Sequence, residues 1–131
     1  MSVEDNKKTA VEFLSCLDKG DGARLAPLLA DNFQYQFMTR MPAFSKPSNK
    51  QQMLANLTNM KAMAPSGFNI TVHAIYGEGP HVGVLAESNT TAGNGKKYSN
   101  VYHFYFRVEN GKIAEGREYC DTNHVREVFM S

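Results

Sequence analysis

The residue types best suited to acid–base chemistry lie on two segments joined by a predicted hairpin. Glu118 and His103 lie on the two arms of the Asn110-Gly111 turn, at positions that come nearly opposite each other in an antiparallel pair. A carboxylate next to an imidazole can accept a proton and return it. Tyr35, on an earlier segment, offers a hydroxyl to a substrate oxygen. The pattern predicts Glu118 as catalytic acid/base, His103 as its assistant and Tyr35 as the residue that orients the substrate.

The side chains expected around Glu118 are mostly apolar. Side chains alternate between the two faces of a strand, and residues opposite each other on paired strands share a face. The side chains of Glu118 and His103 can therefore both point toward one cavity. In such surroundings burial raises the pKa of the Glu118 carboxyl toward neutrality, where a base is useful. The predicted lining of this ligand pocket is Phe13, Phe37, Val84, Ser88, Val101, Tyr105, Gly116 and Cys120.

A shift of one residue in strand register leads to a different interpretation. It would place Arg117 and Tyr119 on the cavity face instead of Glu118. Glu118 would then be an exposed carboxylate beside an arginine. Independently, His103 is open to a structural interpretation, as a buried imidazole bonded to Tyr35 or to a backbone carbonyl. The sequence is compatible with both interpretations.

An aromatic row is predicted on the opposite face of the same strand. Tyr102, Phe104 and Phe106 alternate with the residues assigned to the cavity. Such a row is too apolar for open water, so we expect a second copy of the chain to cover it. The sequence thus favours a homodimer formed through the sheet.

Apolar periodicity divides the chain into a helical half and a strand-rich half. Helical spacing predicts a helix from about Val3 to Lys19, a short one capped by Asp21, and a third from a Ser48/Gln51 capping box to about Met63. Between them, alternation predicts a strand from Asn32. Further strands are predicted at Phe68–Tyr76, His81–Thr90, Tyr98–Val108 and Lys112–Cys120, followed by a short helical turn within Asp121–Phe129.

This order predicts a single α+β domain over residues 1–131. A strongly bent antiparallel sheet would wrap around three helices from the N-terminal half and form a cone with an open mouth. The chain has 131 residues and 42% hydrophobic residues, enough for one sizeable core.

Composition and charge exclude several classes of partner. The net charge is +1 and the basic residues are interleaved with acids, which argues against nucleic acid. No apolar run approaches the roughly 20 residues of a membrane-spanning helix. His73, His81 and His124 lack metal-ligand spacing, so we expect neither metal nor cofactor. Two cysteines without a secretion signal favour a cytoplasmic protein.

The order of elements and four segments resemble the ketosteroid isomerase and nuclear transport factor 2-like superfamily. The segments are Phe13–Asp21, Leu28–Phe33, Val108–Ile113 and Arg117–Asp121. Within the superfamily the chain is most similar to SnoaL-like proteins, which include polyketide cyclases and relatives of limonene epoxide hydrolase. The resemblance implies a cystatin-like α+β fold and a dimer formed through the sheet. It implies little about the reaction, because one fold serves many functions.

The resemblance also places the family's catalytic positions on this chain. The tyrosine, base and acid of ketosteroid isomerase fall on Phe13, Phe37 and His103, so two of the three polar roles are lost. For limonene epoxide hydrolase, the arginine and the carboxylate next to it fall on Ser88 and Thr90. Neither charged side chain of that pair is therefore present in this chain. The hydrolase's tyrosine falls on Tyr35, its asparagine on Phe37 and its last-strand carboxylate on Glu118. The cyclase pair, a last-strand carboxylate with a histidine on the preceding strand, is intact in type as Glu118 and His103.

Three functional hypotheses follow. The first is an enzyme that isomerises, cyclises or hydrates a small apolar carbonyl compound without a cofactor. The second is a non-catalytic member of the fold that binds an apolar ligand or supports a dimer. The third is an interaction module that docks a protein partner through the mouth or the sheet.

Overall fold

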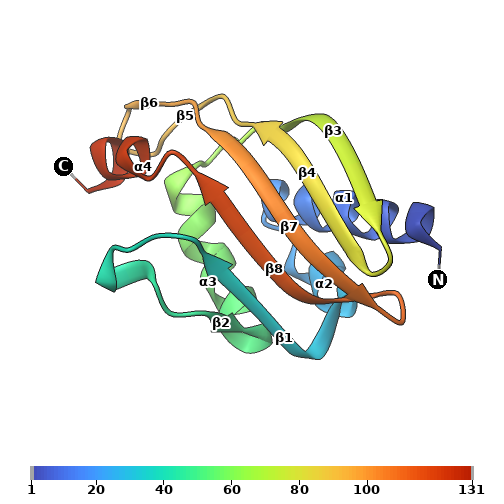
Figure 1. Ribbon diagram of the computed structural model, residues 1–131. Coiled ribbons are helices and arrows are strands. Elements are labelled where there is room, and N and C mark those ends of the chain that lie inside the picture. Colours follow the sequence, from blue (N-terminus) through green and yellow to red (C-terminus); the bar gives the residue numbers. More distant parts are fainter. Residues whose placement is uncertain (1, 131) are drawn as a thin grey trace.

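The computed structural model describes residues 2–130 as a curved, unclosed sheet with helices on one of its faces (Figure 1). The described residues form four α-helices and eight strands, so the fold is mixed α+β. Their order is α1 (Val3–Lys19), α2 (Gly22–Leu25), the 3₁₀ turn η1 (Ala26–Leu28), β1 (Leu29–Phe37), η2 (Pro42–Phe44), β2 (Ser48–Asn49), α3 (Lys50–Met63), β3 (Thr71–Glu78), β4 (His81–Glu87), β5 (Thr90–Thr91), β6 (Lys97–Tyr98), β7 (Val101–Glu109), β8 (Lys112–Cys120) and α4 (Thr122–Phe129).

The main sheet has the strand order β2-β1-β8-β7-β4-β3, and β5 pairs with β6 separately. One feature departs from the predicted antiparallel sheet: β1 runs parallel to β8. The remaining pairs of the main sheet are antiparallel. In Figure 1, α1 and α3 lie behind the sheet, so one face is covered and the other is open. Among residues 2–130, no helix has both the length and the apolar character needed to cross a membrane.

Local signals explain most of the helix boundaries. Gly20 ends α1 in the left-handed region, at φ 67°, where a residue without Cβ is unstrained. The capping box of α3 is formed by Asn49 and Gln52, one residue later than predicted. The predicted short terminal turn is a helix of 8 residues, α4, capped by Asp121.

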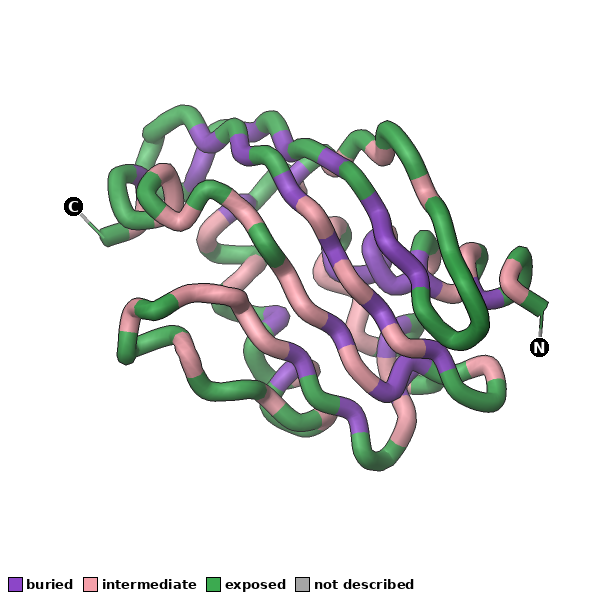
Figure 2. Tube along the Cα trace, viewed as in Figure 1, coloured by how far each residue is buried: buried purple, intermediate pink, exposed green. Residues whose placement is uncertain are grey.

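The core lies between the helices and the covered face of the sheet. Figure 2 shows buried and less buried residues alternating along the central strands, as a sheet covered on one side requires. Tyr102, Phe104 and Phe106 are only 8%, 1% and 0% exposed within a single chain. The prediction that these three form a dimer surface is therefore wrong, because they face the helices.

A carboxylate in α1 fixes the segment that leads into β3. Asp18 accepts backbone hydrogen bonds from Phe68 at 2.6 Å, Asn69 at 2.9 Å and Ile70 at 3.0 Å. Removing the carboxylate leaves these N–H groups without their partner. We therefore expect Asp18→Ala to lower the free energy of unfolding by about 2–3 kcal/mol in urea denaturation.

The matched control for Asp18→Ala is Asp31→Ala, whose side chain is fully exposed. We expect the control to change stability by less than about 0.5 kcal/mol. An equally small effect of Asp18→Ala would show that the segment does not depend on this carboxylate.

Candidate active site

Glu118 and Tyr35 form a hydrogen-bonded pair on the covered side of the sheet. The parallel pairing of β1 with β8 places Tyr35 opposite Gly116 and Phe37 opposite Glu118. The Tyr35 hydroxyl donates to Glu118 Oε1 at 2.6 Å. Gly116 makes room for this contact, since a Cβ at that position would lie 2.7 Å from Tyr35 Cδ1. The glycine thus lets the tyrosine ring cross β8 and reach the carboxylate.

The surroundings of this pair suit a general base. Burial raises the pKa of the Glu118 carboxyl, and the hydrogen bond from Tyr35 lowers it in part. Burial and the nearby Glu118 charge raise the pKa of Tyr35 well above its usual value, so its hydroxyl remains a donor. The second oxygen, Glu118 Oε2, has no hydrogen-bond partner among residues 2–130, and the side chain is partly exposed. One carboxylate oxygen is therefore held while the other is available.

His103 lies on the opposite face of the sheet from Glu118. Phe104 is the residue paired with Glu118, whereas His103 pairs with Tyr119 and its Nε2 hydrogen-bonds the Tyr76 hydroxyl. The predicted placement of His103 beside Glu118 is therefore wrong. A bulge causes the difference: Val108 pairs with Ile113 but Arg107 with Glu115, which leaves Ala114 as an extra residue in β8.

The predicted lining residues divide between the two faces. Phe13, Val84, Ser88 and Gly116 are buried on the covered side, and Phe37 and Cys120 are half-buried. Val101 is 61% exposed, and Tyr105 lies beside His103 and Tyr119 on the open face. The assignment of Val101 and Tyr105 to the pocket is wrong. Both lie two residues from His103 on β7, so their side chains are on the same open face as His103.

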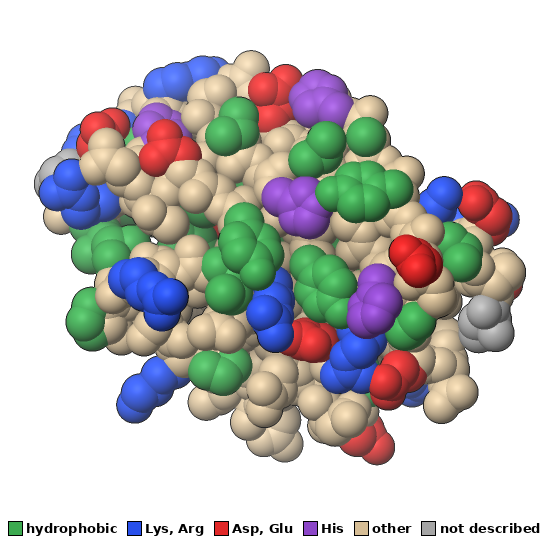
Figure 3. All heavy atoms as spheres, viewed as in Figure 1, with side chains coloured by type: hydrophobic (Ala, Val, Ile, Leu, Met, Phe, Trp, Pro, Cys, Tyr) green, Lys and Arg blue, Asp and Glu red, His purple; other side chains and the backbone are tan. Residues whose placement is uncertain are grey.

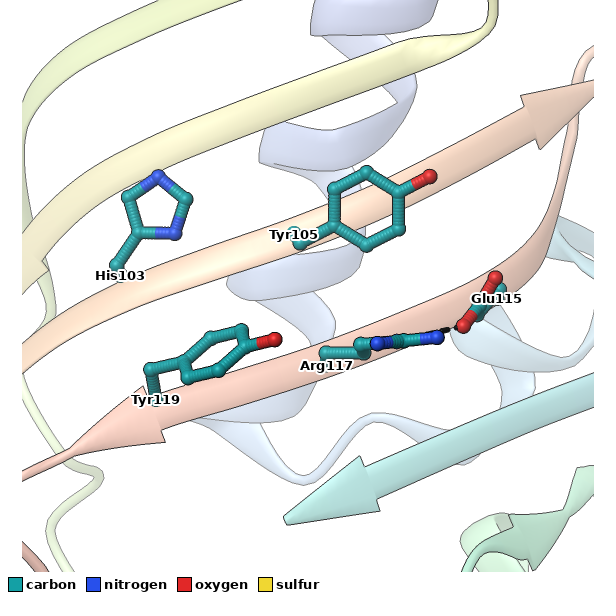
Figure 4. Close-up of a pocket in the computed structure, with 5 residues that line it drawn as sticks. All are labelled: His103, Tyr105, Glu115, Arg117 and Tyr119. Atoms are coloured by element: carbon teal, nitrogen blue, oxygen red, sulfur yellow. Dashed lines mark hydrogen bonds and ion pairs between the residues drawn. The ribbon is translucent and has the colours of Figure 1, made fainter. Parts of the chain in front are cut away.

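The open face carries a shallow recess of its own. Its lining residues, His103, Tyr105, Glu115, Arg117 and Tyr119, extend from β7 and β8 away from the helix behind the sheet (Figure 4). Arg117 Nε donates to Glu115 Oε2 at 2.7 Å. Figure 3 shows hydrophobic, basic, acidic and histidine side chains mixed across this face. Within residues 2–130, no group of three or more His, Cys, Asp or Glu side chains is placed to hold a metal ion.

The structure contains a buried cluster of hydroxyl groups near the ends of β4 and β8 that the sequence does not predict. It joins Ser88 to Tyr102, Tyr102 to Tyr98, and Tyr98 to the Asn100 side chain. Of these four residues, Ser88 is the one predicted as a lining residue of the pocket. The contacts among the four depend on the turn between β6 and β7, which periodicity does not reveal.

Comparisons with known proteins agree with this fold. The SnoaL-like domain profile matches residues 10–116. An NTF2-like protein of unknown function from Burkholderia pseudomallei is similar in structure, with a TM-score of 0.82, 16% identity and coverage of 100% of both chains. An epoxide hydrolase of M. tuberculosis described as LEH-like has a TM-score of 0.78 and 20% identity, covering 98% of this chain and 91% of that one. A putative isomerase from Bacillus subtilis has a TM-score of 0.84 and 17% identity, covering 97% and 94%.

These structural likenesses, all at low identity, establish the fold and leave the reaction open. The profile match extends over most of the chain and includes β1, β7 and the part of β8 up to Gly116. The protein belongs to the SnoaL-like family.

Proposed function

We propose that residues 1–131 form one SnoaL-like domain that binds a small, mostly apolar carbonyl compound beside Glu118. The domain isomerises, cyclises or hydrates this compound by acid–base chemistry without a cofactor. The observation that carries the proposal is the Tyr35–Glu118 pair, in which Oε1 is held at 2.6 Å and Oε2 has no partner among residues 2–130. A held and partly desolvated carboxylate can take a proton from carbon and return it elsewhere.

Each residue of the pair has a distinct role. Glu118 Oε2 removes the proton, and the Glu118 carboxyl later returns it. Tyr35 orients the carboxylate through Oε1, and it thereby orients the substrate relative to Oε2. His103 has no part in this chemistry, because it lies across the sheet beside Tyr76 and Tyr119.

Proton exchange in D₂O tests the proposal without knowledge of the natural substrate. Isomerisation and aldol-type cyclisation both begin with removal of a proton next to a carbonyl group. We expect the protein to accelerate deuterium incorporation into the α-position of acetophenone or 2-cyclohexenone, followed by proton NMR. Exchange at the rate of buffer alone for both ketones would overturn the proposal that Glu118 removes a proton next to a carbonyl group.

A non-catalytic ligand-binding domain is the alternative, and one observation favours it. Phe13 occupies a catalytic position by the family resemblance, yet it is completely buried among other aromatic rings. Thermal stabilisation by the same ketones without proton exchange would support this alternative, since a ligand of the folded state raises stability by mass action.

We also propose a homodimer, formed through the open face of the sheet. The large apolar side chains exposed on this face support it: Tyr76, Leu85, Val101 and Tyr119 are 49%, 43%, 61% and 40% exposed. A second copy would cover these side chains. Two unpaired cysteines, Cys16 and Cys120, are consistent with a reducing compartment such as the cytoplasm.

Leu85→Glu tests the dimer. Leu85 pairs with His103 near the middle of the open face, so a charge there would be buried between two copies. We expect the variant to weaken self-association roughly 30- to 100-fold in light-scattering chromatography. Val11→Glu, at a 37% exposed position on α1, should leave the dimer intact. A wild-type mass of a single 14.6 kDa chain would contradict the proposal.

A further inference from the structure

His103 lies at the centre of the exposed apolar side chains of the open face. Seven large hydrophobic side chains are exposed in residues 2–130, and four of them surround His103: Tyr76, Leu85, Val101 and Tyr119. Leu85 and Tyr119 are the residues paired with His103 on β4 and β8. The rings of Tyr76 and Tyr119 lie 5.8 Å and 6.2 Å from the imidazole, centroid to centroid. The surface that the proposed homodimer buries therefore encloses a titratable group.

The hydrogen bond of His103 allows its ring to be neutral or charged. Nε2 bonds the hydroxyl of Tyr76, the titratable side chain of β3 that faces it. A hydroxyl can donate to a neutral ring or accept from a protonated one. Tyr105, on the same face of β7, bonds His81 Nδ1 at 2.6 Å instead. Within a single chain His103 is half-buried and lines the shallow recess, so water and protons reach the ring.

No carboxylate among residues 2–130 forms an ion pair with His103. The charged residues that face it from neighbouring strands are Glu87 on β4 and Arg117 on β8, each diagonal to it. Glu87 Oε1 lies 3.0 Å from His73 Nε2 and is occupied there. Arg117 has the same sign as an imidazolium ion, and Glu115 lies beyond Arg117 at the other end of the recess (Figure 4). A proton on His103 is therefore stabilised by water and not by a protein charge.

The charges around the apolar side chains suit a second copy of this chain. Arg107 and Arg117 share the carboxylate of Glu115, at 3.4 Å and 2.7 Å, and Figure 3 shows acidic and basic side chains mixed on this face. In a twofold contact a surface meets itself, so a face with both signs can pair its charges across the interface. His103, among apolar side chains, is the group whose charge such a contact would leave unmatched.

We infer that His103 makes self-association depend on pH: two chains associate through the open face while His103 is neutral, and its protonation separates them. The inference rests on the homodimer proposed above and specifies how that dimer is regulated. A second copy replaces the water around the imidazole with apolar side chains. Burying a charged ring without a partner costs free energy that the apolar contacts then have to offset.

A pH series of the wild-type protein tests the inference. Histidine is the side chain that changes charge between about pH 5 and 8. Each protonated chain releases one proton when the dimer forms, so the dissociation constant increases with up to the second power of the proton concentration. We expect this constant to be roughly 30- to 100-fold larger at pH 5.5 than at pH 8. Sedimentation velocity over a concentration series measures it, and near-UV circular dichroism verifies that the chain is folded at both pH values.

His103→Gln isolates the histidine. Glutamine does not titrate and can still bond the Tyr76 hydroxyl, so the variant should dimerise equally well at pH 8 and at pH 5.5. His81→Gln is the matched control. His81 lies on the same face but at the end of β4, between Arg107 and Glu78 and away from the four apolar side chains. This control should keep the pH dependence of the wild type.

Three results would overturn the inference. The first is a wild-type dissociation constant that is the same at pH 8 and pH 5.5. The second is a loss of dimer at pH 5.5 that persists in folded His103→Gln, and the third is a pH dependence that His81→Gln abolishes. If His103→Gln does not fold, His103→Asn gives the same comparison, and the wild-type series decides independently of either variant.

The dimer and its pH dependence fail in different results. A folded monomer at pH 8 removes both. A dimer of equal strength at the two pH values leaves the dimer and the expectation for Leu85→Glu standing, and removes only the role of His103.

Discussion

Replacing Glu118 by glutamine should lower the rate of α-proton exchange by about 10²–10⁴, the usual contribution of a general base. Glutamine has nearly the same shape and its amide oxygen can still accept the 2.6 Å hydrogen bond from Tyr35. It cannot bind a proton at neutral pH, so binding should be retained while turnover is lost. The measurement is deuterium incorporation into acetophenone, with kcat and KM determined separately.

Glu115→Gln is the control for this experiment. Glu115 lies on the same strand but lines the recess of the open face, where it binds Arg117. We expect its exchange rate to equal that of the wild type. Exchange by Glu118→Gln at the wild-type rate would remove Glu118 from the chemistry.

The pH profile of exchange follows from the environment of Glu118. Because burial raises its pKa, the rate should increase with pH through an ionisation above the ordinary range of glutamate. Tyr35→Phe removes the hydrogen bond that lowers this pKa, so its profile should move to still higher pH. A profile that Tyr35→Phe does not move would show that the hydroxyl has no influence on the base.

The raised pKa also gives Glu118→Gln an effect on stability. A carboxyl whose folded-state pKa is raised binds its proton more tightly in the folded than in the unfolded state. This tighter proton binding stabilises the folded state at low pH. The stabilisation is lost as pH rises from the pKa of Glu118 in the unfolded state through its pKa in the folded state. Above that range the buried Glu118 carboxylate is charged, which lowers the free energy of unfolding. Glu118→Gln should therefore be more stable than the wild type at neutral pH, though less active.

The sequence allowed the elements to be predicted well because each has local signals. Apolar spacing and Gly20 define α1, and Asn110-Gly111 forms the expected hairpin, with positive φ values of 52° and 75°. The pairing of strands that are far apart in the sequence has no comparable local signal. The parallel contact of β1 with β8 links residues about 80 positions apart, and it creates the Tyr35–Glu118 hydrogen bond.

The misplacement of His103 shows how one residue can change a predicted site. Counting outward from the Asn110-Gly111 turn pairs position 103 with position 118 in a regular hairpin. The extra residue Ala114 moves the partner of His103 to Tyr119 and reverses its face relative to Glu118. Ala114 is small and apolar like many strand residues, so the sequence carries no local signal for the bulge.

Truncating Phe13 should have the largest effect on stability among the changes considered. Its side chain is fully buried, and its ring lies 5.0 Å from Phe106 and 5.8 Å from Tyr35, centroid to centroid. Phe13→Ala leaves a cavity among these rings, which typically costs about 3–5 kcal/mol. Urea denaturation should show a lower midpoint with an unchanged slope. Phe44→Ala, at a 41% exposed position, is the control and should cost less than about 1 kcal/mol.

Phe13→Tyr separates packing from chemistry at the same position. By the family resemblance, this change restores a catalytic tyrosine. The position is 0% exposed and surrounded by Phe33, Tyr35 and Phe106, so the added hydroxyl would enter an apolar core. We expect a loss of about 1–3 kcal/mol and no gain in proton exchange. A gain in exchange would mean that substrate reaches α1, and the ligand would then lie deeper under the sheet than Glu118.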